Sequence, residues 1–167
     1  MATQYIPLPP EIATPIGSTF PQFLKVNGTN FPVTSLAFDA STDEACAFKF
    51  RAVNYGSGNL TLDIDWYADT ATSGDVVWSA AIAAITPDSD SQDVETKSLA
   101  TANTVTDSHL GTTGQRLHRA TITISNLDSL AAGDIVWLKL QRTGSSGSDT
   151  MTGDALMTMA TLSYSDT

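Results

Sequence analysis

Two histidines are the first residues whose chemistry could serve catalysis. They are His109, within "DSHLG", and His118, within "RLHRA". A histidine can act as a general acid or base, or as a metal ligand, because its pKa lies near neutrality. No second histidine lies at ligand spacing from either, and serine and aspartate are too frequent here for sequence proximity to define a triad. The favoured interpretation is a hydrogen-bonded histidine at the rim of a sheet.

Three acidic stretches could contribute oxygens to a calcium site. They are "DIDWYAD" (63–69), "PDSDSQDVE" (87–95) and "SDTMTGD" (148–154). Calcium prefers several oxygen ligands, which such loops often supply, but none of the three matches the EF-hand pattern. We therefore predict a solvated acidic surface, with no bound metal and no other cofactor.

Aromatic rings could form a platform on which a sugar stacks. Trp66, Trp78 and Trp137 each fall in the middle of an expected strand, where large rings usually belong to the core. Tyr55, within the turn "NYGSGN", and Tyr67 are better placed to be exposed. These two tyrosines are the candidate glycan-binding residues.

Enzyme signatures are missing from the sequence. It contains no GxSxG, P-loop, HExxH, CxxC or GxGxxG motif. A glycosidase or esterase would need a defined residue pair, and none can be picked out of eighteen scattered acidic residues. Cys46, the single cysteine, has apolar neighbours and is expected to be a small buried side chain. We expect a protein that is not an enzyme.

Charge and length limit the partners of the chain. The net charge of its 167 residues is −10, and the eight basic residues are scattered. Nucleic-acid binding requires clustered lysine and arginine, so nucleic acid is not an expected partner. No apolar run has the length of a membrane span, and the start "MATQYIPLPP" lacks the basic and apolar regions of a signal peptide. The expectation is a soluble protein made in a host cytoplasm.

The elements that would position these residues are short strands. Apolar and β-branched residues alternate with polar ones between turns rich in Gly, Asn, Asp and Ser, a pattern typical of β-structure. The expected strands are 33–40, 44–53, 59–68, 75–85, 91–100, 116–126, 134–143 and 155–166. The segment 79–85 is rich in alanine, so a short helix is an alternative there.

Eight such strands predict an all-β fold. The specific expectation for residues 33–167 is an eight-stranded antiparallel sandwich of the jelly-roll type, in which the long polar stretch 86–115 joins two halves. An immunoglobulin-like sandwich is the second choice, because its frequent Cys–Trp–Cys pattern is missing.

Residues 1–32 follow different rules and are expected to form an extended N-terminal arm. They hold six of the seven prolines and only two charged side chains, Glu11 and Lys25. Proline favours extended backbone and cannot donate to a central strand. The apolar residues expected to bind a partner are Tyr5, Ile6, Leu8, Pro9, Pro10, Ile12, Ile16, Phe20, Phe23 and Leu24. The alternative is that the arm folds back on its own sandwich as an extra edge strand.

Four phrases of the chain resemble a known group of proteins. "DIDWYADTATSGDVVW", "SDSQDVET", "RLHRATITISNLDSLAAGD" and the closing "TLSYSDT" are similar to sequences of small jelly-roll structural proteins of tailed bacteriophages. The resemblance implies a capsid decoration (cement) protein on the surface of a virion, on capsid or tail. It also implies a homotrimer that contacts the major capsid protein or another virion protein. The alternative is a tail-associated or receptor-binding module that recognises a glycan. No functional residue can be transferred from the resemblance.

Overall fold

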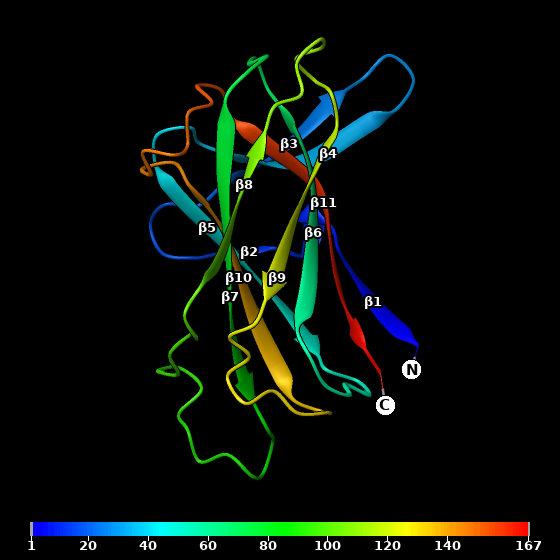
Figure 1. Cartoon of the computed structure of the whole chain (residues 1–167), viewed down its shortest axis with the longest axis vertical. Coiled ribbons are helices and arrows are strands. Elements are labelled where there is room, and N and C mark those ends of the chain that lie inside the picture. The colour runs from blue at the N-terminus through cyan, green and yellow to red at the C-terminus, as the bar shows by residue number, and fades with distance from the viewer. Residues whose placement is uncertain (1, 167) are drawn as a thin grey trace.

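The computed structural model describes residues 2–166, and their regular secondary structure is almost entirely strand (Figure 1). The strands are β1 (Thr3–Leu8), β2 (Thr14–Pro15), β3 (Gln22–Asn27), β4 (Pro32–Phe38), β5 (Asp43–Arg51), β6 (Leu60–Ala68), β7 (Asp75–Ile85), β8 (Asn103–Ser108), β9 (His118–Ile124), β10 (Ile135–Thr143) and β11 (Ala155–Ser165). In this range the only helical element is one 3₁₀ turn, η1 (Pro10–Ile12). No helix within residues 2–166 is long and apolar enough to cross a membrane.

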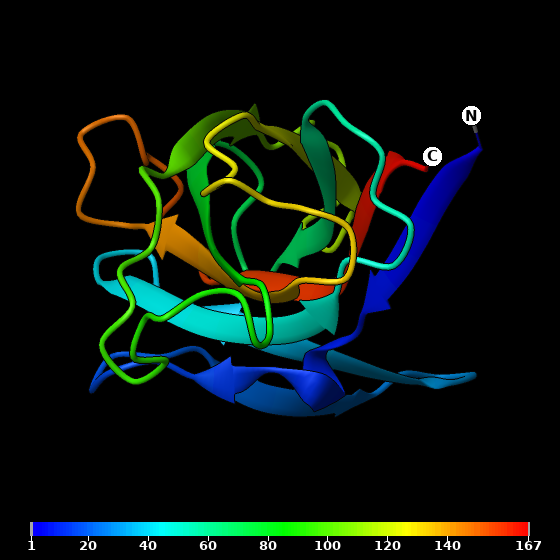
Figure 2. The same ribbon diagram turned by 90° about the horizontal axis from the view of Figure 1, so that it is seen from below.

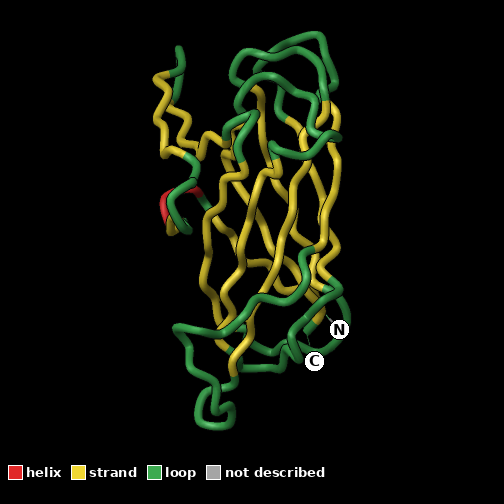
Figure 3. Tube along the Cα trace, turned by 90° about the vertical axis from the view of Figure 1, so that its left-hand side faces the viewer, coloured by secondary structure: helices red, strands yellow, loops and turns green. Residues whose placement is uncertain are grey.

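The strands form two antiparallel sheets that pack face to face. One sheet has six strands in the order β3-β4-β11-β6-β9, with β1 also paired to β11; the other has five, in the order β2-β5-β10-β7-β8. The strands run along the long axis, and the loops gather at the two ends (Figure 3). The eight strands β4–β11 alone form two four-stranded sheets, 4-11-6-9 and 5-10-7-8, which is the jelly-roll arrangement. The predicted all-β jelly-roll sandwich is confirmed.

The core fills the space between the two sheets. In β6 the inward residues Leu60, Leu62, Ile64 and Trp66 are fully buried, as their alternation with polar residues predicts. Trp66 lies 6.4 Å from the Trp78 ring of the opposite sheet, measured between centroids. Burying these large rings supplies much of the apolar area that holds the layers together.

The expected strand 75–85 is present, whereas the expected strand 91–100 is not. Segment 79–85 is a strand and not a helix, because β10 and β8 pair with β7 on its two sides. Segment 91–100 is a loop, and the strand predicted there lies a few residues later, at β8. Asp93 folds its loop into a turn by accepting the Glu95 N–H at 2.9 Å, and local bonding of this kind competes with a sheet ladder.

The first 27 residues fold back on their own sandwich as edge strands, which was the alternative to a free extended arm. β1 pairs with β11, β2 pairs with β5 and β3 pairs with β4, so the segment passes from the six-stranded sheet to the five-stranded sheet and back. Figure 2 shows the blue chain starting beside the red strand β11 and then passing along the cyan strand β5. Pro7 is tolerated because β1 has a partner on one side only.

The fold places the expected partner-binding residues of this segment in different environments. Leu8 and Pro10 face the chain's own core, so these two side chains are not presented to a partner. Tyr5, Ile12, Phe20 and Phe23 are exposed, and Ile6, Pro9, Ile16 and Leu24 are half-buried. A partner for the exposed members stays a prediction, as does the trimer.

A buried ion pair anchors the loop between β10 and β11. Arg142 and Asp149 both have side chains with no exposed surface, and Arg142 Nη2 lies 2.7 Å from Asp149 Oδ1. The guanidinium also donates to the carbonyls of Phe38, Met151 and Gly153. Asp149 accepts the Val77 N–H at 2.9 Å, which ties the loop to β7.

Candidate functional site

A groove on the outer face of the five-stranded sheet follows β10. Side chains of β10 alternate, so Val136 and Leu138 enter the core while Trp137, Lys139 and Gln141 point outward and are half-buried. In the sheet register, Trp137 lies opposite Ala83 and Lys49, Lys139 opposite Ala81 and Ala47, and Gln141 opposite Ser79 and Ala45. Five of these six neighbours are alanine or serine, so the β10 side chains project above the small side chains on both sides of them.

A loop forms the wall of this groove. Residues 86–102 connect β7 to β8 and fold back against the outer face, bringing Val94, Lys97 and Leu99 beside β10. Two adjoining depressions of about 390 Å³ and 250 Å³ share Leu99 and Lys139. Their lining residues are Ile16, Ala47, Ser79, Ala81, Ala83, Val94, Lys97, Leu99, Ala100, Ala102, Thr104, Trp137, Lys139, Gln141 and Thr143.

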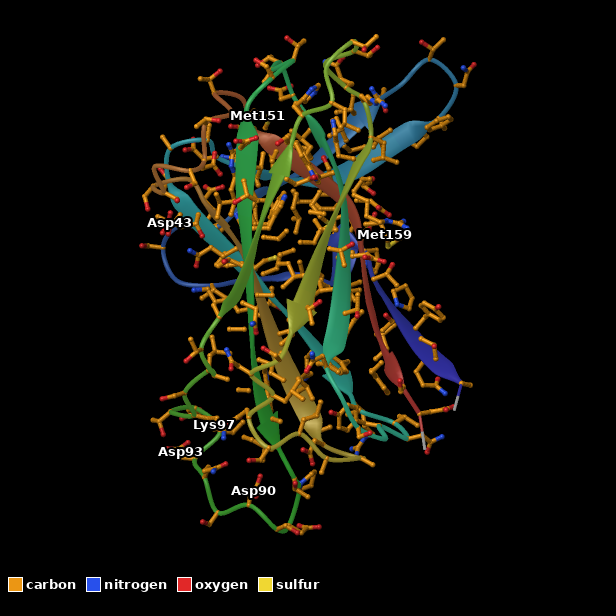
Figure 4. The ribbon with its side chains drawn as sticks, in the orientation of Figure 1. Asp43, Asp90, Asp93, Lys97, Met151 and Met159 are labelled. Atoms are coloured by element: carbon orange, nitrogen blue, oxygen red, sulfur yellow. The ribbon has the colours of Figure 1, made fainter. Side chains whose placement is uncertain are left out.

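The wall is tied to the sheet by specific contacts. Lys97 Nζ forms an ion pair with Asp128 Oδ2 at 3.0 Å, and the same oxygen accepts the Ala84 N–H of β7 at 2.8 Å. The Ala100 N–H donates to Ile82 O at 2.8 Å. Figure 4 places Lys97 on this loop, with Asp90 at its outer tip. The groove is therefore preformed, which lowers the entropy lost when a ligand binds.

The groove offers the chemistry of ligand binding. The indole of Trp137 gives an apolar surface, and Gln141 and Lys139 add hydrogen-bond donors. Ser79, Thr104 and Thr143 add hydroxyls along the same line. A flat ligand with one apolar face and many hydroxyls fits this combination.

The expectation that Trp137 belongs to the core, based on its position in the middle of a strand, is wrong because the ring is half-buried on the outer face. Its immediate neighbours Val136 and Leu138 are apolar, which conceals the alternation. The signal was its parity, because Trp137 shares a face with Lys139 and Gln141 and not with the buried positions.

The two tyrosines predicted to be exposed have different fates. Tyr55 is 6 % exposed, its hydroxyl donates to Gly58 O, and its ring packs edge-on against Tyr164 at 5.6 Å. The expected exposure of Tyr55 is therefore wrong, and burial raises its pKa. Tyr67 is half-buried on the outer face of the six-stranded sheet. It lines a separate hollow of about 440 Å³ with Val26, Phe31, Val33, Gln115, Leu117 and Thr158.

The two histidines lie together, and neither lines the groove along β10 or the hollow beside Tyr67. His118 is 4 % exposed, stacks on Trp66 with 4.5 Å between centroids, and accepts the Leu110 N–H at Nε2. His109 accepts the Gly111 N–H at Nδ1, and its ring centre is 4.5 Å from that of His118. These hydrogen bonds hold the turn between β8 and β9, as expected for histidines at a sheet rim.

Protonation of His118 should weaken this turn. Burial lowers the pKa of His118, and neighbouring His109 and Arg116 lower it further, while Asp107 acts in the opposite direction. A folded pKa below the unfolded value means that the unfolded chain binds the proton first. The free energy of unfolding should therefore fall as the pH drops below about 6.5, the ordinary histidine value. Urea unfolding at pH 7.5 and 5.5 measures this change.

The variant His118→Gln serves as the control for that titration. It keeps an acceptor for the Leu110 N–H but has no proton to gain, so its stability should change less between the two pH values. Equal losses in the variant and the unaltered chain would show that His118 does not carry the effect.

The acidic stretches are engaged in local contacts. Asp149 belongs to the buried ion pair, Asp90 accepts the Thr86 N–H at 2.8 Å, and Arg119 bonds Asp65 through two nitrogens. At the opposite end from the loop 86–102, burial raises the pKa of Glu44, and the Asp39 charge adds to that rise. Among residues 2–166, no group of three or more His, Cys, Asp or Glu side chains has an arrangement suited to a metal ion.

Cys46 is 2 % exposed on the inner face of β5. Burial raises the pKa of its thiol to about 12, so the thiolate is disfavoured at neutral pH. The expectation of a small buried side chain is confirmed.

Comparisons with known proteins identify the fold. No family model and no curated protein sequence matches the chain. The CBM36-1 domain of a multidomain xylanase from the hindgut metagenome of Trinervitermes trinervoides is similar in structure. Its TM-score is 0.52 at 12 % identity, and the match covers 95 % of this chain and 96 % of that domain. The CBM35 of Abf62 from Cellvibrio japonicus gives a TM-score of 0.51 at 15 % identity, covering 98 % and 99 % of the two chains. At these identities the likeness establishes a shared β-sandwich fold.

The resemblance to structural proteins of tailed bacteriophages is wrong. The two similar structures described above are carbohydrate-binding modules, and no family or sequence match points to a phage protein. The quoted phrases consist of alternating strands and turns rich in Asp, Ser and Gly, which β-sandwiches of unrelated function share. The capsid-decoration assignment and the location on a virion surface rested on that resemblance and are wrong with it.

Proposed function

We propose that this chain is a non-catalytic carbohydrate-binding module that holds a glycan in the groove along β10. The observation that carries the proposal is Trp137, a half-buried indole that rises from a floor of alanines on an outer sheet face. Supporting it, two proteins of the same fold bear the name of carbohydrate-binding modules.

The groove has the length and the order of groups that a sugar chain would use. From Trp137 to Thr143 the outward side chains of β10 extend over about 20 Å, at ~3.4 Å per residue. One sugar stacks its C–H face on the indole, and the following sugars meet Lys139, Gln141 and Thr143 as hydrogen-bond partners. Binding adds no covalent chemistry in this mechanism.

Replacement of Trp137 by alanine should abolish most of the affinity. Truncating a tryptophan at the centre of a binding site costs about 2 kcal/mol or more, which corresponds to roughly 30-fold in Kd. Isothermal titration calorimetry against soluble xylan, mixed-linkage glucan, galactan and polygalacturonate would measure it. A thermal melt of the variant separates lost binding from lost folding.

Tyr67→Ala is the matched control, because it removes another half-buried ring from the opposite sheet. It should leave glycan affinity unchanged. If Tyr67→Ala removes the affinity and Trp137→Ala does not, the glycan site is the hollow on the six-stranded sheet. If no glycan in the panel binds, the proposed function fails.

A further inference from the structure

We infer that the groove selects an anionic glycan, whose carboxylate is bound by Lys49 and Lys139 beside the sugar that stacks on Trp137. The inference rests on the proposed function and specifies the class of glycan. The geometry that supports it is the sheet register, which puts two lysines next to Trp137 on the same face.

The sheet register places both lysines next to Trp137. Lys49 on β5 is the direct cross-strand partner of Trp137, and such pairs have Cβ atoms about 5 Å apart. Lys139 is the next outward residue along β10, about 7 Å away at the strand rise. A lysine side chain is long enough to reach the space beside the ring from either position.

Neither lysine is neutralised by the protein. Within residues 2–166 the ion pairs join Lys97 to Asp128, Arg119 to Asp65 and Arg142 to Asp149, so Lys49 and Lys139 take no part in any of them. The cross-strand neighbours of Lys139 are Ala47 and Ala81. The chain has a net charge of −10, so two unpaired lysines beside an aromatic ring make this part of the surface locally positive.

The groove has a charge polarity along β10. No side chain that lines it is acidic, as far as the described residues extend. At the Trp137 end, the Asp128 carboxylate is paired with Lys97 and accepts the Ala84 N–H. At the other end of β10, Asp43 accepts a hydrogen bond from Gln141 at 3.3 Å. In the wall loop, Asp93 is turned to its own backbone by the bond to the Glu95 N–H. An acidic sugar is therefore favoured at the Trp137 end and disfavoured at the Asp43 end.

The test compares acidic polymers with uncharged counterparts of the same linkage. The probes are polygalacturonate with its full methyl ester, glucuronoxylan with unsubstituted xylan, and oxidised cellulose oligomers with cello-oligosaccharides. At 20 mM NaCl we expect the acidic member of at least one pair to bind about tenfold tighter or more, because a charge-assisted hydrogen bond contributes that much. At 300 mM NaCl the preference should shrink.

Variants assign the preference to the two lysines. Lys49→Gln and Lys139→Gln should each reduce the ratio of acidic to neutral affinity, whereas Lys25→Gln on β3, in the other sheet, should leave it unchanged. If neutral polymers bind as tightly as their acidic counterparts, or if Lys49→Gln and Lys139→Gln leave the ratio intact, this inference is overturned while the proposed function stands. If neither kind of polymer binds, the proposed function has failed as well.

Discussion

Replacing Arg142 by methionine is expected to lower the free energy of unfolding by about 3–5 kcal/mol, the cost of leaving a buried charge without its partner. Asp149 would remain in the interior with no exposed side-chain surface. Three carbonyls, from Phe38, Met151 and Gly153, would lose the donor that Arg142 supplies. Urea unfolding of both chains at pH 7 measures the difference.

Arg119→Met is the control for that experiment. Arg119 also bonds an aspartate through two nitrogens, at 2.7 and 2.9 Å from Asp65, but its side chain is 60 % exposed. Exposed ion pairs contribute little, so this variant should change stability only slightly. Equal losses in the two variants would contradict the claim that burial gives the Arg142 pair its effect.

The double variant Arg142→Met with Asp149→Leu refines the interpretation. Replacing a buried ion pair by apolar side chains is often neutral, because both charges leave together. Here only partial recovery is expected, since the three carbonyls and the Val77 N–H stay without their partners. Full recovery would mean that the pair, and not the bonded loop, carries the stability.

Gly74→Ala is expected to destabilise the fold by about 2–5 kcal/mol. Gly74 has φ +102, a region that costs an L-residue roughly 1–2 kcal/mol. A Cβ at this position would also lie 2.7 Å from Met151 Cα and 2.8 Å from Met151 N, so the loop anchored by Arg142 would have to move. Overpacking of this kind adds about 1–3 kcal/mol. A thermal melt combined with urea unfolding would determine the loss.

Gly133→Ala separates the two contributions. Gly133 has φ +92, but a Cβ built there meets no heavy atom within 4 Å. It should therefore show the backbone cost alone and lose less stability than Gly74→Ala. If both variants lose a comparable free energy of unfolding, the contact with Met151 does not explain the destabilisation by Gly74→Ala.

The sequence predicted most of the sandwich because its alternation of apolar and polar residues is regular. β6, β9 and β10 match their expected segments within two residues at each end. The strands of the first 27 residues were harder to predict, since prolines favour extended backbone without indicating what it pairs with. Those strands are edges held by β4, β5 and β11, and such partners are a tertiary property.

The candidate site was largely hidden from the sequence. Its floor depends on Ala81 and Ala83 standing opposite β10, which only the register reveals. Its wall depends on the loop 86–102 folding back through Lys97, a contact with Asp128 that no spacing rule predicts. Arg142 illustrates the same limit, because its inward parity on β10 was visible but its partner Asp149 was not.

The position of β11 in the middle of the six-stranded sheet affects how the chain emerges from the ribosome. β1, β4 and β6 all pair with β11, which follows them in the chain. During synthesis the backbone edges that pair with β11 lack that partner until residues 155–165 appear, so chaperones have a long interval in which to bind the chain. Such distant pairing also predicts slow folding, in about milliseconds to seconds.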